Sequence, residues 1–127
     1  MGLYAGELAE EAFAKLQERY GYRPSGPIRI ELYRSHADFS VRTLGLTGLG
    51  ALGVAFGPVL VMDSPSAMEP GEFNWGSTLW HELAHVYAIR KSGGRVPRWF
   101  TEGLSVLEER RARPDRRWPR TRCSRRC

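Results

Sequence analysis

Apolar side chains recur every three or four residues near the start of the chain. The recurring positions are Leu8, Ala12, Phe13, Leu16 and Tyr20, with glutamates and a lysine between them. This spacing places the apolar side chains on one helix face, so it predicts an amphipathic helix over residues 2–20. Glycines and prolines within residues 21–27 end the pattern.

The next two segments change periodicity. Residues 28–33 (IRIELY) alternate apolar and charged side chains, which predicts a half-buried strand. Ser35 followed by Asp38 resembles a capping box in a looser form, so we expect a short helix that runs to about Leu44.

Two β-rich runs, Val54–Phe56 and Val59–Met62, follow a glycine-rich stretch. Gly57 and Pro58 separate them. Because proline cannot donate a hydrogen bond to a ladder, this interruption predicts a strand that lies at a sheet edge or carries a bulge.

Two helices are predicted in the last part of the domain. Asn74 or Ser77 can cap the first of them, which runs to about Lys91 and stops at Gly93-Gly94. Pro97 opens the second, over residues 98–112. The order helix, strand, helix, strand and two helices predicts a small α+β fold.

The charge of the chain is divided unevenly between its body and its C-terminal tail. The 127 residues carry a formal net charge of +5, and this length allows one domain. Residues 110–127 hold nine of the basic residues and one of the acidic ones, so residues 1–109 carry a net charge of −3. We therefore expect a domain over residues 1–112 and a basic, disordered Arg/Pro/Cys tail over residues 113–127.

Because the basic residues are concentrated in the tail, the net positive charge of the whole chain does not describe the domain. Nucleic-acid binding through Arg110–Arg126 is an alternative function, but Trp118 is the single aromatic residue there, so stacking on bases is not expected. Residues 43–62 are uncharged and long enough to span a bilayer, yet they contain five glycines and Pro58 and favour a loop and a strand. The sequence pattern predicts no signal peptide. Both cysteines lie in the tail, so cysteine content does not indicate the cellular compartment.

The strongest chemical signal is the sequence His-Glu-Leu-Ala-His at residues 81–85, an HExxH motif inside a predicted helix. Residues four apart lie on one helix face, so the imidazoles of His81 and His85 can bind one Zn²⁺ ion. Glu82 lies about 100° around the helix and can act as a general base toward a zinc-activated water. The alternative is that both histidines are ordinary residues of the core or its boundary.

A catalytic zinc site needs a third protein ligand. Glu102, at the start of the last predicted helix, is our candidate, because a Gly-Gly turn can return that helix to the motif. The alternative for Glu102 is an acid that only stabilises a helix N-terminus. Cys123 and Cys127 are four residues apart and could bind a metal, but they lie in the tail.

Residues 80–86 (WHELAHV) and 97–105 (PRWFTEGLS) together resemble the peptidase-MA-like gluzincins, which are bacterial zinc metallopeptidase domains. The resemblance covers residues 5–112. It implies a zincin-like half-domain, in which a small sheet with an edge strand packs on the HExxH helix and a Glu-bearing helix follows. It also implies zinc held by His81, His85 and Glu102, Glu82 as general base, and a peptide or protein substrate. Such domains are often attached to tetratricopeptide repeats, so repeats in a longer parent chain are a further expectation.

The chain departs from this family after Glu102, where larger gluzincins add a Tyr or His that stabilises the oxyanion. No Tyr or His follows Glu102 here. Either an upstream residue such as Tyr33 or His36 serves, or the C-terminal half is missing. A zinc-binding fold without turnover is therefore the alternative function.

Three further sites complete the sequence-based hypotheses. In zincins an edge strand lies beside the metal, so we expect Val54–Phe56 or Val59–Val61 to border the cleft, with a purely structural strand as the alternative. Residues 48–53 match a dinucleotide-binding pattern formally, but they follow a predicted helix, so we favour a turn. Ser105 or Glu109 could orient a ligand imidazole, although solvent-facing positions are the favoured interpretation for both.

Overall fold

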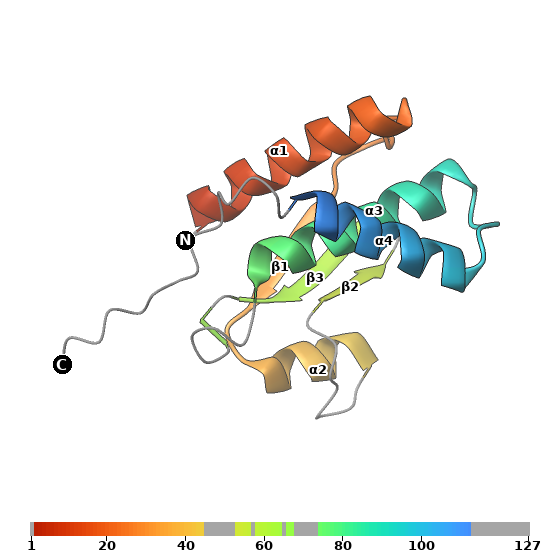
Figure 1. The fold of residues 1–127 in the computed structure, drawn as a ribbon. Helices are drawn as coiled ribbons and strands as arrows, with labels where there is room; N and C mark the ends of the chain where they lie inside the picture. The colour runs from red at the N-terminus through yellow and green to blue at the C-terminus, as the bar shows by residue number, and fades with distance from the viewer. Residues whose placement is uncertain (1, 45–52, 57, 65, 68–73, 113–127) are drawn as a thin grey trace.

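The computed structural model describes residues 2–44, 53–56, 58–64, 66–67 and 74–112. Within them it shows an α+β fold of four helices and a three-stranded mixed sheet (Figure 1). The helices are α1 (Gly2–Tyr20), α2 (His36–Leu44), α3 (Trp75–Lys91) and α4 (Arg98–Ala112), and the strands are β1 (Arg29–Tyr33), β2 (Gly53–Phe56) and β3 (Val59–Asp63). The predicted α+β class is confirmed.

The helix predictions hold closely. α1 and α4 cover the predicted ranges, and α2 ends at Leu44 as expected. Asn74 is the N-cap of α3, because its side-chain oxygen accepts a hydrogen bond from the backbone N–H of Ser77 at 3.2 Å. Four N-terminal N–H groups of a helix lack partners within the helix, and this contact satisfies one of them.

The sheet has the order β1-β3-β2, so β3 is its central strand. β1 pairs with β3 in parallel, from Arg29 opposite Val59 to Tyr33 opposite Asp63. β2 pairs with β3 antiparallel, from Gly53 opposite Met62 to Phe56 opposite Val59. Among the described strands β2 therefore lies at one edge of the sheet.

This topology corrects one prediction. The run Val54–Met62 is two strands rather than one interrupted strand, and Val59–Met62 is central rather than at an edge. Pro58 does not exclude a central strand, because it precedes the first ladder position of β3, where no N–H is needed. Its carbonyl still accepts a hydrogen bond from the backbone N–H of Arg29 at 2.8 Å.

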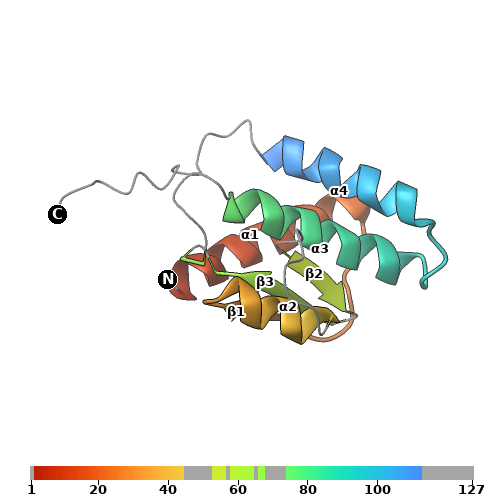
Figure 2. The ribbon, with the colours of Figure 1, turned by 90° about the horizontal axis from the view of Figure 1, so that it is seen from below.

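The two faces of β3 pack against different helices. Leu60 and Met62 are fully buried in the main core with apolar residues of α1 and α3. Successive side chains of a strand point to opposite faces, so Val61 and Asp63 point the other way. There the imidazole of His36 on α2 lies 2.6 Å from the carboxylate of Asp63. Figures 1 and 2 show α2 on the opposite side of the sheet from α1 and α3.

α4 packs along α3, and a buried carboxylate connects it to α1. The side chain of Glu108 on α4 is fully buried. Its oxygens accept hydrogen bonds from the guanidinium of Arg19, from the hydroxyl of Tyr20 at 2.7 Å and from the guanidinium of Arg111 at 3.0 Å. Buried carboxylates require such partners, so these contacts fix α4 against the end of α1.

Some predictions fall on residues that the structure does not describe. Residues 45–52, which hold most of the dinucleotide-like pattern, and the predicted tail at residues 113–127, with Cys123 and Cys127, lie outside the described residues. Within the described part of the chain, no helix is both long enough and apolar enough to cross a membrane.

Candidate metal centre

The candidate site is built on the helical hairpin of α3 and α4. Gly93 and Gly94 follow α3 with φ angles of 62° and 77°, a backbone region that glycine adopts without strain. These residues reverse the chain, so α4 returns along α3 (Figure 2). The start of α4 therefore lies beside the later turns of α3, where His85 is, and its later turns lie beside His81.

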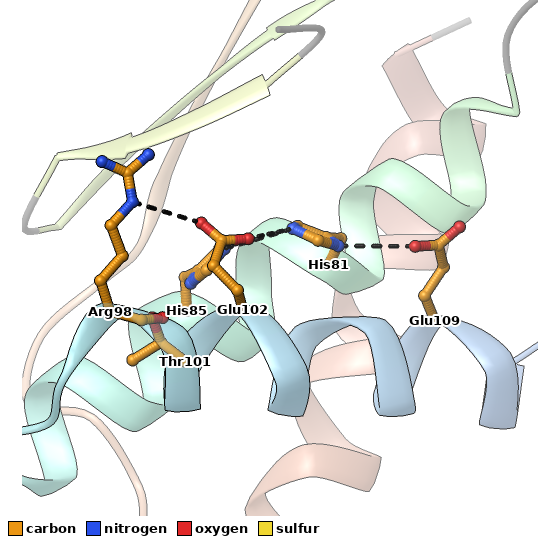
Figure 3. A network of polar contacts seen from close by, with 6 residues as sticks. All are labelled: His81, His85, Arg98, Thr101, Glu102 and Glu109. Atoms are coloured by element: carbon orange, nitrogen blue, oxygen red, sulfur yellow. Dashed lines mark hydrogen bonds and ion pairs between the residues drawn. The ribbon is translucent and has the colours of Figure 1, made fainter.

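Three side chains of this hairpin converge on one point (Figure 3). The Nε2 atoms of His81 and His85 are 3.2 Å apart. One carboxylate oxygen of Glu102, Oε2, lies 3.5 Å from each of them. All three side chains are half-buried, so the point where they meet is open to solvent on one side.

The shape of this triangle fits a tetrahedral zinc ion. With zinc–ligand distances of about 2.0–2.1 Å, neighbouring ligand atoms of a tetrahedron are about 3.3–3.4 Å apart. The three observed separations, 3.2, 3.5 and 3.5 Å, match that edge length closely. Two imidazoles and one carboxylate are also a ligand set of catalytic zinc sites, which keep a fourth position for water or substrate.

Glu102 has two different neighbours for its two oxygens. While Oε2 faces the histidines, Oε1 lies 3.8 Å from Nε of Arg98, one helical turn earlier. The structure thus brings Glu102 to the two histidines of residues 81–85.

Glu109 contacts the other side of the His81 ring. Its Oε2 lies 3.4 Å from Nδ1 of His81, while Nε2 of the same ring faces Glu102. A carboxylate at Nδ1 holds that proton in place and directs the Nε2 lone pair toward a metal. The favoured interpretation of Ser105 and Glu109 as solvent-facing residues was wrong, since Ser105 is fully buried and Glu109 is half-buried against His81.

Glu82 lies in a different environment from the three converging side chains. It is buried, and this burial, assisted by the negative charge of Glu102, raises the pKa of its carboxyl group to about 7. A general base works best when its pKa is close to the working pH. The Glu82 carboxylate therefore has a proton affinity suited to accepting a proton near neutrality.

β2 passes close to the Glu82 side chain at a glycine. A Cβ atom at Gly53 would lie 2.8 Å from Cγ and 3.2 Å from Oε1 of Glu82. Because real Cβ atoms do not approach other atoms to 2.8 Å, any other residue at position 53 would require the Glu82 side chain to shift. The sheet edge and the HExxH helix thus meet at Glu82.

Burial also affects His85. It lowers the pKa of the imidazole, although the neighbouring Glu102 carboxylate acts in the opposite direction. A lowered pKa favours the neutral ring, which is the form that binds a metal ion.

The structure does not bring every candidate residue to the site. The ring of His36 contacts the Asp63 carboxylate at 2.6 Å, and the hydroxyl of Tyr33 donates to Glu31 at 3.5 Å. Both candidates for an oxyanion donor are thus engaged at β1, β3 and α2, whereas the triad lies on α3 and α4.

Sequence reasoning named Glu109 as a residue that could orient a ligand imidazole but favoured a solvent-facing position for it. Glu109 follows Glu102 by seven residues, which is two helical turns on the same face, and this spacing supported the first interpretation. Gly53 was missed. No local signal marks Gly53 as the residue that contacts Glu82, because the contact joins two distant segments.

Comparisons of the chain with protein-family models, with curated proteins and with solved structures find no match.

Proposed function

We propose that the chain is a zinc-dependent peptidase of the gluzincin type, with a zincin-like domain that hydrolyses peptide bonds in a peptide or protein substrate. His81, His85 and Glu102 would hold the zinc ion. The observation that carries this proposal is the triangle of their three ligand atoms, whose sides match the edges of a tetrahedral zinc site.

When bound, zinc polarises a carbonyl group and lowers the pKa of a bound water to about 7. The residues of the chain supply the proton transfers. Glu82, which follows the first histidine on α3 and is buried, would accept a proton from the attacking water and pass it to the leaving amine. Glu109 keeps the His81 ring oriented, and Gly53 leaves room for the Glu82 carboxylate.

β2 offers a place for the substrate backbone. Among the described strands it pairs with β3 alone, so its second edge carries backbone groups that can bond to an extended peptide. Its first residue, Gly53, adjoins Glu82, so a peptide on this edge would pass close to the general base. This supports Val54–Phe56 as the strand at the cleft, and the central position of Val59–Val61 removes it from that role.

The test combines metal analysis with three variants. The parent chain is expected to bind one zinc per chain and to cleave an unfolded, fluorescently labelled protein. Glu82→Gln keeps the zinc and loses cleavage, whereas His81→Ala loses the zinc. Glu7→Gln is the matched control for Glu82→Gln, because Glu7 lies exposed on α1, and it keeps both properties. Cleavage that survives in Glu82→Gln contradicts the mechanism.

A second function is favoured by one observation. Tyr33 and His36, the two candidates for an oxyanion donor, are engaged by Glu31 and Asp63. Loss of one oxyanion donor costs other enzymes about 10²–10³ in rate. The alternative is a zincin fold that binds zinc without turnover, and it predicts stoichiometric zinc in the parent chain with no cleavage.

A further inference from the structure

Arg98, the first residue of α4, extends into solvent beside the candidate metal centre (Figure 3). Its side chain is 92% exposed, and its Nε atom lies 3.8 Å from Oε1 of Glu102, one helical turn later. Among the described residues, this is the one hydrogen bond or ion pair of the Arg98 guanidinium. The two terminal amino groups of the guanidinium are therefore open to a further partner.

The basic residues of α3 and of the turn after it have a different role from Arg98. Their side chains donate hydrogen bonds to backbone carbonyls of the domain, and these residues are Arg90, Lys91 and Arg95. Arg98 donates to no carbonyl of the described residues. The packing of the hairpin therefore does not account for its guanidinium.

The carboxylate of Glu102 connects Arg98 to the triad. Its Oε1 atom faces Arg98, and its Oε2 atom lies 3.5 Å from Nε2 of both His81 and His85. Two oxygens on one carboxylate carbon are about 2.2 Å apart, so Nε of Arg98 lies within about 6 Å of Oε2. An extended peptide rises about 3.3 Å per residue, so this distance corresponds to about two residues of a bound peptide.

Charge is distributed unevenly along the side of the site that α4 forms. Figure 3 shows Arg98 and Glu109 on opposite sides of the triad, with Arg98 beyond Glu102 and Glu109 beyond His81. Glu102 would share its charge with a metal ion held by the triad, which leaves the Arg98 cation less completely balanced. An incoming carboxylate restores that balance, whereas an incoming Lys or Arg side chain is repelled.

We propose that Arg98 is a specificity-determining residue, which binds a carboxylate of the substrate within about two residues of the cleaved bond. This inference rests on the proposed peptidase function and names its substrate class, acidic peptides. The planar guanidinium presents paired N–H groups that match the two oxygens of a carboxylate. An acidic side chain and a free C-terminus both offer this group, so the test separates these two sources.

Cleavage of four matched peptides tests the proposal. The peptides share one otherwise uncharged sequence, carry Asp or Asn at one internal position, and end in a free carboxylate or an amide. At low ionic strength we expect an acidic peptide to be cleaved with a kcat/KM about fivefold above that of the Asn amide, and added salt to reduce this ratio. Mass spectrometry of the products locates the cleaved bond, which lies within about two residues of the recognised carboxylate. A preference for Asp identifies the side chain as the ligand, and a preference for the free end identifies the C-terminus.

Three variants assign the preference to Arg98. Arg98→Gln abolishes it, and Arg98→Glu reverses it, so that a peptide with Lys in place of Asp becomes the better substrate. Arg95→Gln is the matched control, because Arg95 lies in the same hairpin but its Nε atom donates to the carbonyl of Ser92 at 3.3 Å. It keeps the ratio of the parent chain. Equal cleavage of all four peptides by the parent overturns the proposal, as does an Arg98→Gln variant with the parent's ratio.

Binding of the same peptides distinguishes this proposal from the peptidase function. Fluorescence anisotropy of labelled peptides gives dissociation constants for Glu82→Gln with added zinc, without cleavage. We expect an acidic peptide to bind about fivefold more tightly than the Asn amide, and Arg98→Gln in the same background to remove the difference. A parent chain that cleaves none of the peptides contradicts the peptidase function, while the binding ratio still decides the role of Arg98. Equal dissociation constants for acidic and neutral peptides overturn that role.

Discussion

The Oε2 atom of Glu109 lies 3.4 Å from Nδ1 of His81, on the side of the ring opposite the nitrogen that faces Glu102 and His85. The imidazole is therefore held between two carboxylates of α4, which are two helical turns apart. Glu109 orients the His81 ring, and Glu102 faces the Nε2 atoms of His81 and His85. α4 therefore supplies both a candidate metal ligand and a residue that positions another candidate ligand.

Removal of the Glu109 carboxylate should weaken zinc binding. We expect Glu109→Gln to raise the zinc dissociation constant by about 10–100-fold, because a neutral amide replaces the charged acceptor and fixes the tautomer and orientation of the His81 ring less firmly. Competition with a chelator of known affinity measures this change. Glu7→Gln, the same change at an exposed position of α1, is expected to bind zinc like the parent. Equal affinities of the Glu109→Gln variant and the parent would show that the contact has no influence on the metal.

A methyl group at Gly53 should separate metal binding from catalysis. The new Cβ of Gly53→Ala would lie 2.8 Å from Cγ of Glu82, so the Glu82 side chain must shift. Misplacement of a catalytic group by about 1 Å can cost about 10²-fold in rate, so we expect a loss of that size in kcat with the zinc content unchanged. Gly103→Ala, where the Cβ meets open space, should leave kcat unchanged. A Gly53→Ala variant with full activity would show that the position of Glu82 is not critical.

The buried Glu108 should contribute strongly to stability. Glu108→Ala removes the acceptor for Arg19, Tyr20 and Arg111, and the Tyr20 hydroxyl is then left without this partner. Breaking a buried ion pair costs about 3–5 kcal/mol, and partial solvent access of Arg19 reduces this to about 2–3 kcal/mol of unfolding free energy. Urea denaturation measures the change, with the exposed Glu7→Ala as control. A loss below about 0.5 kcal/mol would contradict the role of Glu108 in fixing α4 on α1.

Stability should fall in alkaline solution through Tyr87. Burial raises the pKa of its hydroxyl to about 12, although the charge of Arg23 acts in the opposite direction, and the hydroxyl donates to the carbonyl of Phe13 at 3.0 Å. The folded-state pKa lies above the ordinary value of 10, so the unfolded chain releases this proton first. The contribution is therefore complete below pH 10 and is lost between about pH 10 and 12.

Urea unfolding of the parent and of Tyr87→Phe at pH 8 to 11 checks this expectation. The variant loses about 1 kcal/mol at pH 8 with the hydrogen bond, and its stability declines less steeply above pH 10. Tyr20, whose pKa burial also raises, is present in both proteins and contributes equally. Parallel declines would show that Tyr87 does not titrate in this range.

Local signals predicted most of this structure. The periodicity of residues 2–20, the cap at Asn74 and the glycines after Lys91 depend on neighbours along the chain, and each helix formed where they indicated. The His81–His85 spacing and the short turn before α4 likewise favoured Glu102 as the third member of the cluster, and the structure brings it to the two histidines.

Other features depend on contacts between distant segments. β3 is central because it pairs with β1 across the whole of α2, and nothing near Pro58 indicates that partner. From the sequence alone, Glu108 cannot be distinguished from an acidic residue on the exposed side of a helix. Its burial depends on its contacts with Arg19 and Tyr20 of α1, which are distant in sequence. On α4 the polar residues Ser105 and Glu108 are buried, while the aromatic rings of Trp99 and Phe100 are exposed. The sequence of this helix is therefore only weakly amphipathic, and its pattern does not indicate which face packs inward.

The turn at Gly93 and Gly94 also bears on the order in which the domain forms. It joins the two helices that carry every side chain of the triangle and its support, all within residues 81–109. Contacts between segments so close in sequence require little loop closure and form early in folding. The parallel pairing of β1 with β3 joins residues 30 apart, such as Arg29 and Val59, whereas His85 and Glu102 are 17 apart. A metal ion that binds the hairpin would therefore stabilise it before the sheet is complete, and the folding rate of the chain should rise with zinc concentration.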